Sequence, residues 1–281
     1  MTVPLALLIA AAAAAVALTL LFVLRRLAPD DGFWGQPEPN HSGSAIGVLG
    51  GVFAILVAFV MFLALQNFID AKRKAEAEAT AVERQFHVAE AFHPGLRTRL
   101  HGRLICYARA VSFEEWPQLE HGEHSELVDD WGLESEIAVE RADLGDPVDA
   151  HALDLFDELE LERAEARRDR IAAAERFVPG LLWVALIAGG TVLILYLTTF
   201  ANRGTRPALQ ALLVGGVAMV AALNLTVIRF LDSPYSGAAG SIKPTAMEAT
   251  LEEIDRELQR EFAGTPIPCD GSGNPRGDVL S

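Results

Sequence analysis

Side chains that could carry out catalysis are sparse in this sequence and lie apart from one another. The chain has no Ser/His/Asp or Cys/His arrangement, no phosphate-binding Gly-rich loop and no zinc-protease motif. Its two cysteines, Cys106 and Cys269, match neither a disulfide framework nor a zinc-ligand spacing, and we expect Cys106 to be a packed thiol. His121, Glu123 and His124 are close in sequence, but a Gly-interrupted acidic loop is weak evidence for a metal site. We therefore predict that this protein is not an enzyme and that it has no catalytic residue, metal site or cofactor.

A different kind of chemistry is indicated by one stripe of side chains. At about 100° per residue, eight residues fall on one face of a helix: Ser44, Val48, Gly51, Ile55, Phe59, Phe62, Gln66 and Asp70. The stripe is polar at both ends and bulky and apolar in the middle. A pore-lining helix with a hydrophobic constriction that gates by dewetting would look like this. In the other interpretation, which the residues alone favour, Ile55, Phe59 and Phe62 face lipid or pack between helices.

The stripe lies on the second of four apolar blocks, and the other three blocks are expected to pack around that helix. The four blocks cover residues 3–24, 44–68, 181–200 and 208–230, and each is close to the roughly 20 residues that a spanning helix needs. The first is followed by Arg25 and Arg26 instead of a small-residue cleavage site, so we interpret it as a retained helix and not as a signal peptide. Arg229 ends the fourth block, and we expect it to snorkel to the boundary and pair with Asp232.

The second block should continue into water as one helix. Residues 71–84 are rich in Ala, Glu, Lys and Arg, which favour helix, and no proline follows the block until Pro94. Its small residues Gly47, Gly50, Gly51, Ala54 and Ala58 share a face next to the stripe, where they would allow another helix to approach closely.

The orientation follows from the basic residues near the spans. Eleven lysines and arginines flank the spans on the side of the central loop and the C-terminal segment, against four in the two short loops: Arg25, Arg26, Arg203 and Arg206. The positive-inside rule therefore places both termini and the central loop in the cytoplasm.

The central loop is strongly acidic. Between Val111 and Glu162 there are eighteen Asp and Glu residues and a single basic residue, Arg141. Such a segment is most often a solvated face, and the alternative is an acidic vestibule that concentrates cations at a pore mouth. Helices are predicted at residues 148–176 and 245–262, the second with an apolar stripe that should dock on the cytoplasmic helices, and residues 264–281 are expected to be disordered.

Several motifs resemble the bacterial bestrophin-like domain family over roughly residues 47–262. They are Gly50-Gly-Val-Phe53 through Phe59 with Asp70-Ala-Lys-Arg, then Phe177-Val-Pro179 with Trp183, and most specifically Leu231-Asp-Ser-Pro-Tyr-Ser-Gly237. The turn residues Asp232, Pro234, Tyr235 and Gly237 carry the resemblance, although the family usually has Phe in place of Tyr235. Bestrophins proper follow this turn with an acidic run that takes part in calcium binding. Here Ala-Ala-Gly-Ser follows Gly237, so calcium gating by that route is not expected.

The resemblance implies an all-α membrane protein with four transmembrane helices and long helical cytoplasmic extensions. It further implies a homo-oligomeric ion channel of the bacterial inner membrane, a pentamer if it follows bestrophins, with the second span lining the pore. Ile55, Phe59 and Phe62 would form its neck and Ser44, Gln66 and Asp70 its mouths, and its partners would be lipid and inorganic ions, not nucleic acid. The expected segments are the first two transmembrane helices at 1–69, a cytoplasmic helical domain at 70–178 and the last two transmembrane helices at 179–231. A cytoplasmic turn with a docking helix at 232–263 and a disordered tail at 264–281 follow. The competing hypothesis is a non-conducting scaffold or sensor that recruits a cytoplasmic partner through its acidic surface.

Overall fold

The computed structural model describes residues 3–27, 39–142, 147–199 and 206–277. The chain divides into two compact units, one made of residues 1–67 and 176–232 and the other of residues 68–175 and 233–281. We call them the span unit and the soluble unit. The short loop at 28–38 and the chain end at 278–281 lie outside the described residues.

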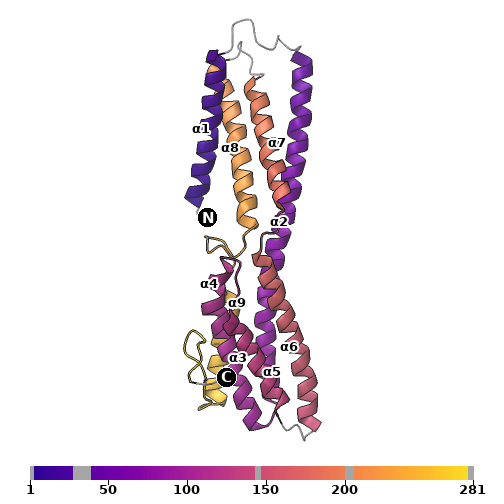
Figure 1. Ribbon diagram of the computed structural model, residues 1–281, viewed down its shortest axis with the longest axis vertical. Helices are drawn as coiled ribbons and strands as arrows, with labels where there is room; N and C mark the ends of the chain where they lie inside the picture. The colour runs from indigo at the N-terminus through magenta and orange to yellow at the C-terminus, as the bar shows by residue number, and fades with distance from the viewer. Residues whose placement is uncertain (1–2, 28–38, 143–146, 200–205, 278–281) are drawn as a thin grey trace. The chain divides into compact units, whose positions relative to one another are not determined.

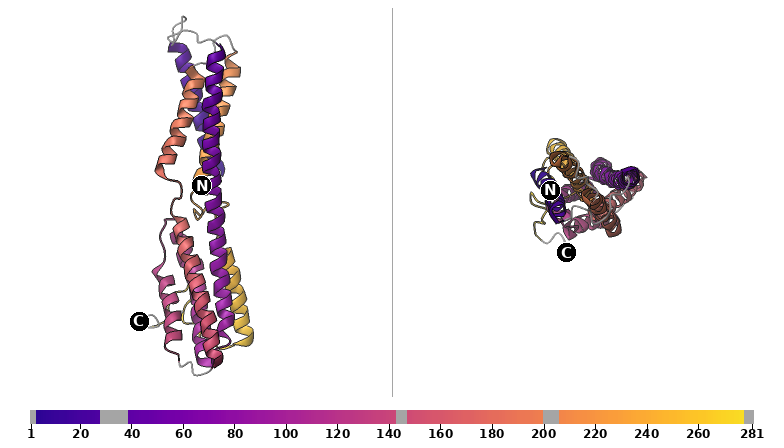
Figure 2. Two further views of the ribbon diagram at one scale, coloured as in Figure 1. Left: turned by 90° about the vertical axis from the view of Figure 1, so that its right-hand side faces the viewer. Right: turned by 90° about the horizontal axis from the view of Figure 1, so that it is seen from above.

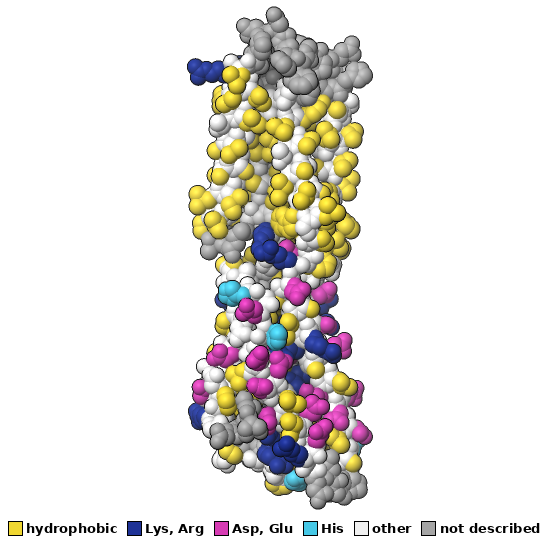
Figure 3. Space-filling model, in the orientation of Figure 1, with side chains coloured by type: hydrophobic (Ala, Val, Ile, Leu, Met, Phe, Trp, Pro, Cys, Tyr) yellow, Lys and Arg dark blue, Asp and Glu magenta, His cyan; other side chains and the backbone are white. Residues whose placement is uncertain are grey.

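Among the described residues, four helices are long and apolar enough to cross a membrane, and the span unit contains three of them and the apolar part of the fourth. They are α1 (Val3–Leu27), the first part of α2 (Pro39–Ala89), α7 (Gly180–Thr199) and α8 (Pro207–Leu231) (Figure 1). Hydrophobic side chains cover the face of this unit that Figure 3 shows. The all-α membrane fold expected from the sequence is therefore confirmed.

Close packing in the span unit depends on small residues. Ala17 and Leu21 of α1 pack against Val214 and Ala218 of α8 in one buried cluster. On α7, a Cβ atom added to Gly189 or Gly190 would lie 3.0 Å or 3.3 Å from the Phe53 ring of α2. In lipid, where helices gain little from burying apolar surface, such close approach is a main source of association.

The regular elements in the described part of the soluble unit are also helices. It contains the last part of α2, then α3 (Pro94–Ala110), a π-helical turn η1 (Val111–Glu115), α4 (Trp116–Leu119), α5 (Glu126–Glu140), α6 (Pro147–Ala174) and α9 (Thr245–Glu261) (Figure 2). Met247, Ile254 and Leu258 of α9 are buried in the same core as Phe86 and Trp131. The predicted docking of this last helix through its apolar stripe is confirmed.

Two helices of the soluble unit bury stripes at coiled-coil-like spacing. On α6 the buried positions are Ala152, Phe156, Leu159, Arg163, Ala166 and Arg170, and on α2 they include Ala71, Ala75, Glu78, Val82, Gln85 and Ala89. Steps of three and four residues keep one face directed at a neighbour. Each stripe thus carries charged or polar residues at positions that an apolar side chain would ordinarily fill.

The structure differs from the sequence analysis at its C-terminal end. Cys106 and Cys269 form a disulfide across 163 residues of sequence, although the sequence predicted no disulfide and a packed Cys106 thiol. Residues 264–277, expected to be disordered, are placed against the soluble unit, and Cys269 is fully buried there. Composition alone was misleading because a covalent bond and specific hydrogen bonds hold a segment that has few apolar side chains.

Candidate functional site

The stripe predicted on α2 is open to the outside of the single chain along its whole length. Ile55, Phe59 and Phe62 are 72%, 57% and 55% exposed, and Ser44 and Gln66 are exposed as well. The opposite side of the same helix is buried, with Val60 and Ala64 both at 0%. This part of α2 therefore has two apolar sides. One packs within the chain, and the other is exposed and can contact lipid or another subunit.

The small residues beside the stripe are also uncovered. A Cβ atom added at Gly47, Gly50 or Gly51 would meet nothing within 4 Å. Gly189 and Gly190 of α7 pack against Phe53 of α2, whereas these three glycines of α2 have no such neighbour within the described part of the chain. Small residues at such spacing allow another helix to approach closely in lipid.

Asp70, at the far end of the stripe, belongs to the soluble unit. Its carboxylate accepts a hydrogen bond from Arg73 Nη1 at 3.3 Å, and both side chains are more than half exposed. An exposed pair like this contributes little to stability and leaves the carboxylate in contact with water.

The turn motif after α8 has a structural role at each of its four residues. Within the span unit, Asp232 is buried, accepts a hydrogen bond from the Val178 backbone amide at 2.7 Å, and lies 3.9 Å from Arg229. The predicted Arg229–Asp232 pairing is thus present.

Within the soluble unit, the Pro234 carbonyl accepts a hydrogen bond from the Ile242 amide. Tyr235 is buried and its hydroxyl donates to the Ala71 carbonyl of α2 at 3.1 Å. Gly237 has φ +65°, which favours glycine, and a Cβ there would lie 1.9 Å from Glu120 Oε1.

A buried network of charges joins α2, η1 and α6 in the soluble unit. Arg170 is fully buried between Glu78 and Glu115, and donates hydrogen bonds to both carboxylates. Arg167 donates to Glu115 at 2.6 Å, and the Tyr107 hydroxyl donates to Glu78 at 2.7 Å. Every carboxylate here has a cationic or hydroxyl partner, as buried charges require.

The charges in this network are held in place by its electrostatics. Burial alone would raise the pKa of Glu115, but the nearby Arg170 and Arg167 outweigh it and lower that pKa. Burial, together with the Glu78 charge, raises the pKa of Tyr107 well above its usual value, so this hydroxyl remains a hydrogen-bond donor. The network therefore keeps Glu115 as a partner for the two arginines and fixes how α2, η1 and α6 meet.

Sequence analysis missed this network because it treated charged helical residues as solvated. Glu115 and Asp129 belong to the acidic central segment, yet both pair with Arg167, and Glu134 pairs with Arg103 at 2.7 Å. Part of the acidity is thus neutralised inside the unit, while other Asp and Glu side chains gather on the surface that Figure 3 shows.

Another group of side chains has the composition of a metal site. His87, Glu90 and Glu257 bring their donor atoms within 4.8 Å of one another, with His87 Nδ1 3.2 Å from Glu90 and 3.6 Å from Glu257. All three remain partly exposed, and their mutual ion pairs and hydrogen bonds account for the arrangement. The residues 121, 123 and 124 considered from the sequence form no such group among the described residues, and His124 instead lies 3.8 Å from Asp129.

Comparison with known proteins identifies the relatives of this four-helix arrangement. The family model described as the Bestrophin-like domain matches residues 7–247, which is most of the chain. The chain belongs to the bestrophin-like domain family. A search of curated proteins finds no match.

Solved structures of bacterial bestrophin homologs share the fold. One structure of a homolog from Klebsiella pneumoniae is 15% identical, with a TM-score of 0.64 over 92% of this chain and 99% of that chain. Another structure of a homolog from the same organism is 15% identical, with a TM-score of 0.61 over 94% and 99% of the two chains. A third structure, of a membrane protein, is 14% identical with a TM-score of 0.63. At such low identity the likeness shows that this bestrophin-like protein has the fold of these structures.

Proposed function

We propose that this bestrophin-like protein is one subunit of a homo-oligomeric ion channel in which α2 lines the pore. The observation that carries the proposal is the α2 stripe, whose Ile55, Phe59 and Phe62 are each more than half exposed while the other side of the helix is buried. A ring of subunits would bring the copies of this stripe together around one axis. The open glycine face beside it would then meet the neighbouring subunit.

In this proposal the three apolar side chains form a hydrophobic neck. A narrow apolar constriction expels water and so blocks hydrated ions until it widens. Ser44 and Gln66 would provide polar groups at the two ends of the neck, and Asp70 a carboxylate beyond Gln66. Reversal potentials in salt gradients would decide whether cations or anions pass, because an acidic vestibule favours cations whereas bestrophins are chiefly anion channels.

The orientation is part of the same proposal. The excess of lysine and arginine beside the central loop favours a cytoplasmic soluble unit and cytoplasmic termini in a bacterial inner membrane. Cysteine-reactive labels of opposite membrane permeability, applied to single cysteines placed at Thr2 and Ser281 in a Cys106→Ser/Cys269→Ser background, would test it. Labelling of both by an impermeant reagent in intact cells would contradict it.

The decisive experiment is ion flux from proteoliposomes that contain the purified protein. Phe59→Ala should raise flux because it widens and wets the neck, and Phe59→Trp should lower it. Leu212→Ala is the matched control, since Leu212 is a 70% exposed apolar residue of α8 that the proposal keeps away from the axis. Its flux should equal that of the unmodified protein.

Absence of flux from a well-folded oligomer, at varied pH, calcium and voltage, would refute the channel proposal. It would favour the non-conducting scaffold or sensor, in which the same α2 face only joins subunits. In that case Phe59→Ala and Phe59→Trp would change oligomer stability and nothing else.

A further inference from the structure

The C-terminal segment of residues 264–277, here called the strap, runs along one face of α3. Its Pro266 carbonyl lies over Gly102, its Cys269 is bonded to Cys106, and its Gly273 lies over Ala110. The three α3 residues are spaced by four, so they share one side of the helix. At Gly102 an added Cβ would come within 2.8 Å of the Pro266 carbonyl oxygen, so the strap needs a glycine there.

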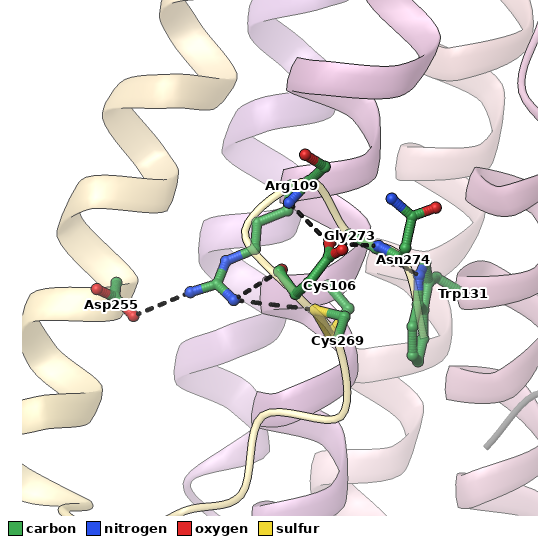
Figure 4. The surroundings of a disulfide bond; sticks show 9 residues. Cys106, Arg109, Trp131, Asp255, Cys269, Gly273 and Asn274 are labelled. Atoms are coloured by element: carbon green, nitrogen blue, oxygen red, sulfur yellow. Dashed lines mark hydrogen bonds and ion pairs between the residues drawn. A yellow bond between two sulfur atoms is a disulfide. The ribbon is translucent and has the colours of Figure 1, made fainter. Parts of the chain in front are cut away.

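Besides the disulfide, whose surroundings Figure 4 shows, a small set of contacts joins the strap to the helices. Ile267 packs against the core, and Asn274 Nδ2 donates to Glu114 of η1 at 3.4 Å. Arg109 of α3 donates to the Asp270 carbonyl at 3.1 Å, and Trp131 of α5 donates its indole N–H to the Gly273 carbonyl at 2.8 Å. Within the strap, the Asp270 carboxylate accepts from the backbone amides of Ser272 and Asn274, both at 2.9 Å. The strap is therefore a small self-bonded turn that is fastened to the helices at a few points.

Charge near the sulfur atoms favours one direction of bond cleavage. Arg109 Nη1 lies 4.0 Å from Cys269 Sγ, and Arg109 also pairs with Asp255 of α9 at 3.8 Å. A guanidinium beside a sulfur stabilises the thiolate, and a stabilised thiolate is the better leaving group in thiol–disulfide exchange. Cys269 is thus the sulfur that should leave when the bond is attacked.

We propose that the Cys106–Cys269 pair is a thiol–disulfide switch that fastens the strap to α3 when oxidised and releases it when reduced. The reaction partner is a dithiol, either a small reductant or a dithiol oxidoreductase. One thiolate of the dithiol attacks Cys106 Sγ, the S–S bond breaks, and Cys269 leaves as a thiolate beside Arg109. The second thiolate of the dithiol then attacks the mixed disulfide, so that Cys106 is released and the dithiol becomes a disulfide. Two electrons pass to the protein, and the two cysteine sulfurs take up the two protons.

Access to the bond requires the strap to lift first. Both cysteines are 0% exposed, so a dithiol reaches them only in molecules whose strap has opened locally. The rate of reduction should therefore follow the open fraction, which the Trp131 and Arg109 hydrogen bonds keep low. Dithiols are abundant in cytoplasm, where thiols are normally kept reduced, so a soluble unit on that side would have a strap that reports the redox state.

The test is the rate at which dithiothreitol reduces the purified full-length protein, followed by maleimide gel shift. Trp131→Phe removes the hydrogen bond to Gly273 and should speed reduction roughly 2- to 12-fold, the factor that corresponds to one typical hydrogen bond. Trp116→Phe is the matched control, because Trp116 is a buried indole that donates to Ile242 at 3.2 Å, away from the strap. Its reduction rate should not change. Equal rates in the two variants would overturn the proposal that strap opening controls access.

Hydrogen exchange of the strap supplies the second measurement. The amides of Asp270 and Arg276 donate backbone hydrogen bonds within the strap, and they should lose protection once the native disulfide is reduced. Cys269→Ser should show the same fast exchange with or without dithiothreitol. If the strap stays protected after complete reduction of the unmodified protein, the bond is a structural staple and the switch is refuted.

Discussion

Replacing Arg170 by methionine should reveal how strongly the soluble unit depends on its buried charges. Arg170 lies between Glu78 and Glu115 with no exposure. Arg170→Met leaves Glu78 with the Tyr107 hydroxyl, and it leaves Glu115 with Arg167 and the Ser125 backbone amide. Removing one partner of a buried ion pair costs about 3–5 kcal/mol, since an uncompensated charge stays in a medium of low polarity. For a chain of this size each kcal/mol lowers Tm by about 2–4 °C, so the expected loss is about 6–20 °C.

Thermal unfolding followed by tryptophan fluorescence would measure this loss, because Trp116 and Trp131 are both packed in the same unit. Arg168→Met is the control, since Arg168 is an exposed neighbour on α6 and should change stability by less than about 0.5 kcal/mol. Adding Glu78→Gln to Arg170→Met should restore part of the loss, because it removes the charge that has lost its cation. A Tm for Arg170→Met within 2 °C of the unmodified protein would refute the reasoning.

Two further changes test local conformation and pH dependence. Gly237→Ala should destabilise by about 1–2 kcal/mol because of its left-handed φ, while the exposed Glu120 carboxylate can move away from the new Cβ at little cost. Gly122→Ala, with φ +77° and open space around it, is the matched control and should lower Tm by a similar amount; a clearly larger Tm loss for Gly237→Ala would contradict this reasoning. Burial lowers the pKa of His101 from 6.5 to about 4, so the unfolded chain binds a proton more readily than the folded one. The free energy of unfolding is therefore unaffected by this ring above pH 6.5 and falls by up to about 3 kcal/mol as the pH drops towards 4. His101→Gln should flatten the curve of Tm against pH in that range.

Helices and their exposed faces followed directly from sequence patterns. The run without a breaker before Pro94 predicted one helix from the second span onward, and α2 extends from Pro39 to Ala89. The α2 stripe was placed on one face by the helical period alone, and that face is exposed in the single chain. Local periodicity was sufficient here because each of these features is contained in one continuous helix.

Features that join distant segments were not predicted. Glu78 and Arg170 are 92 residues apart, and Cys106 and Cys269 are 163 apart, so no local pattern pairs them. A signal for the first pair was present, however. Arg170 continues the apolar α6 stripe, and Glu78 stands among the buried alanines of α2. A charge on an otherwise apolar helix face indicates a buried partner, although it does not name that partner.

The disulfide also restricts the order in which the chain can be completed. Its two cysteines enclose α7 and α8, so during synthesis Cys269 emerges from the ribosome after both of these helices, while Cys106 emerges before them. The covalent ring can close only when both helices have been made and the two ends of the soluble unit have met. In the unfolded chain a ring of this length removes conformational freedom equivalent to about 5 kcal/mol by the chain-entropy model. The native bond therefore marks a chain whose synthesis has passed both α7 and α8 and whose soluble unit has assembled.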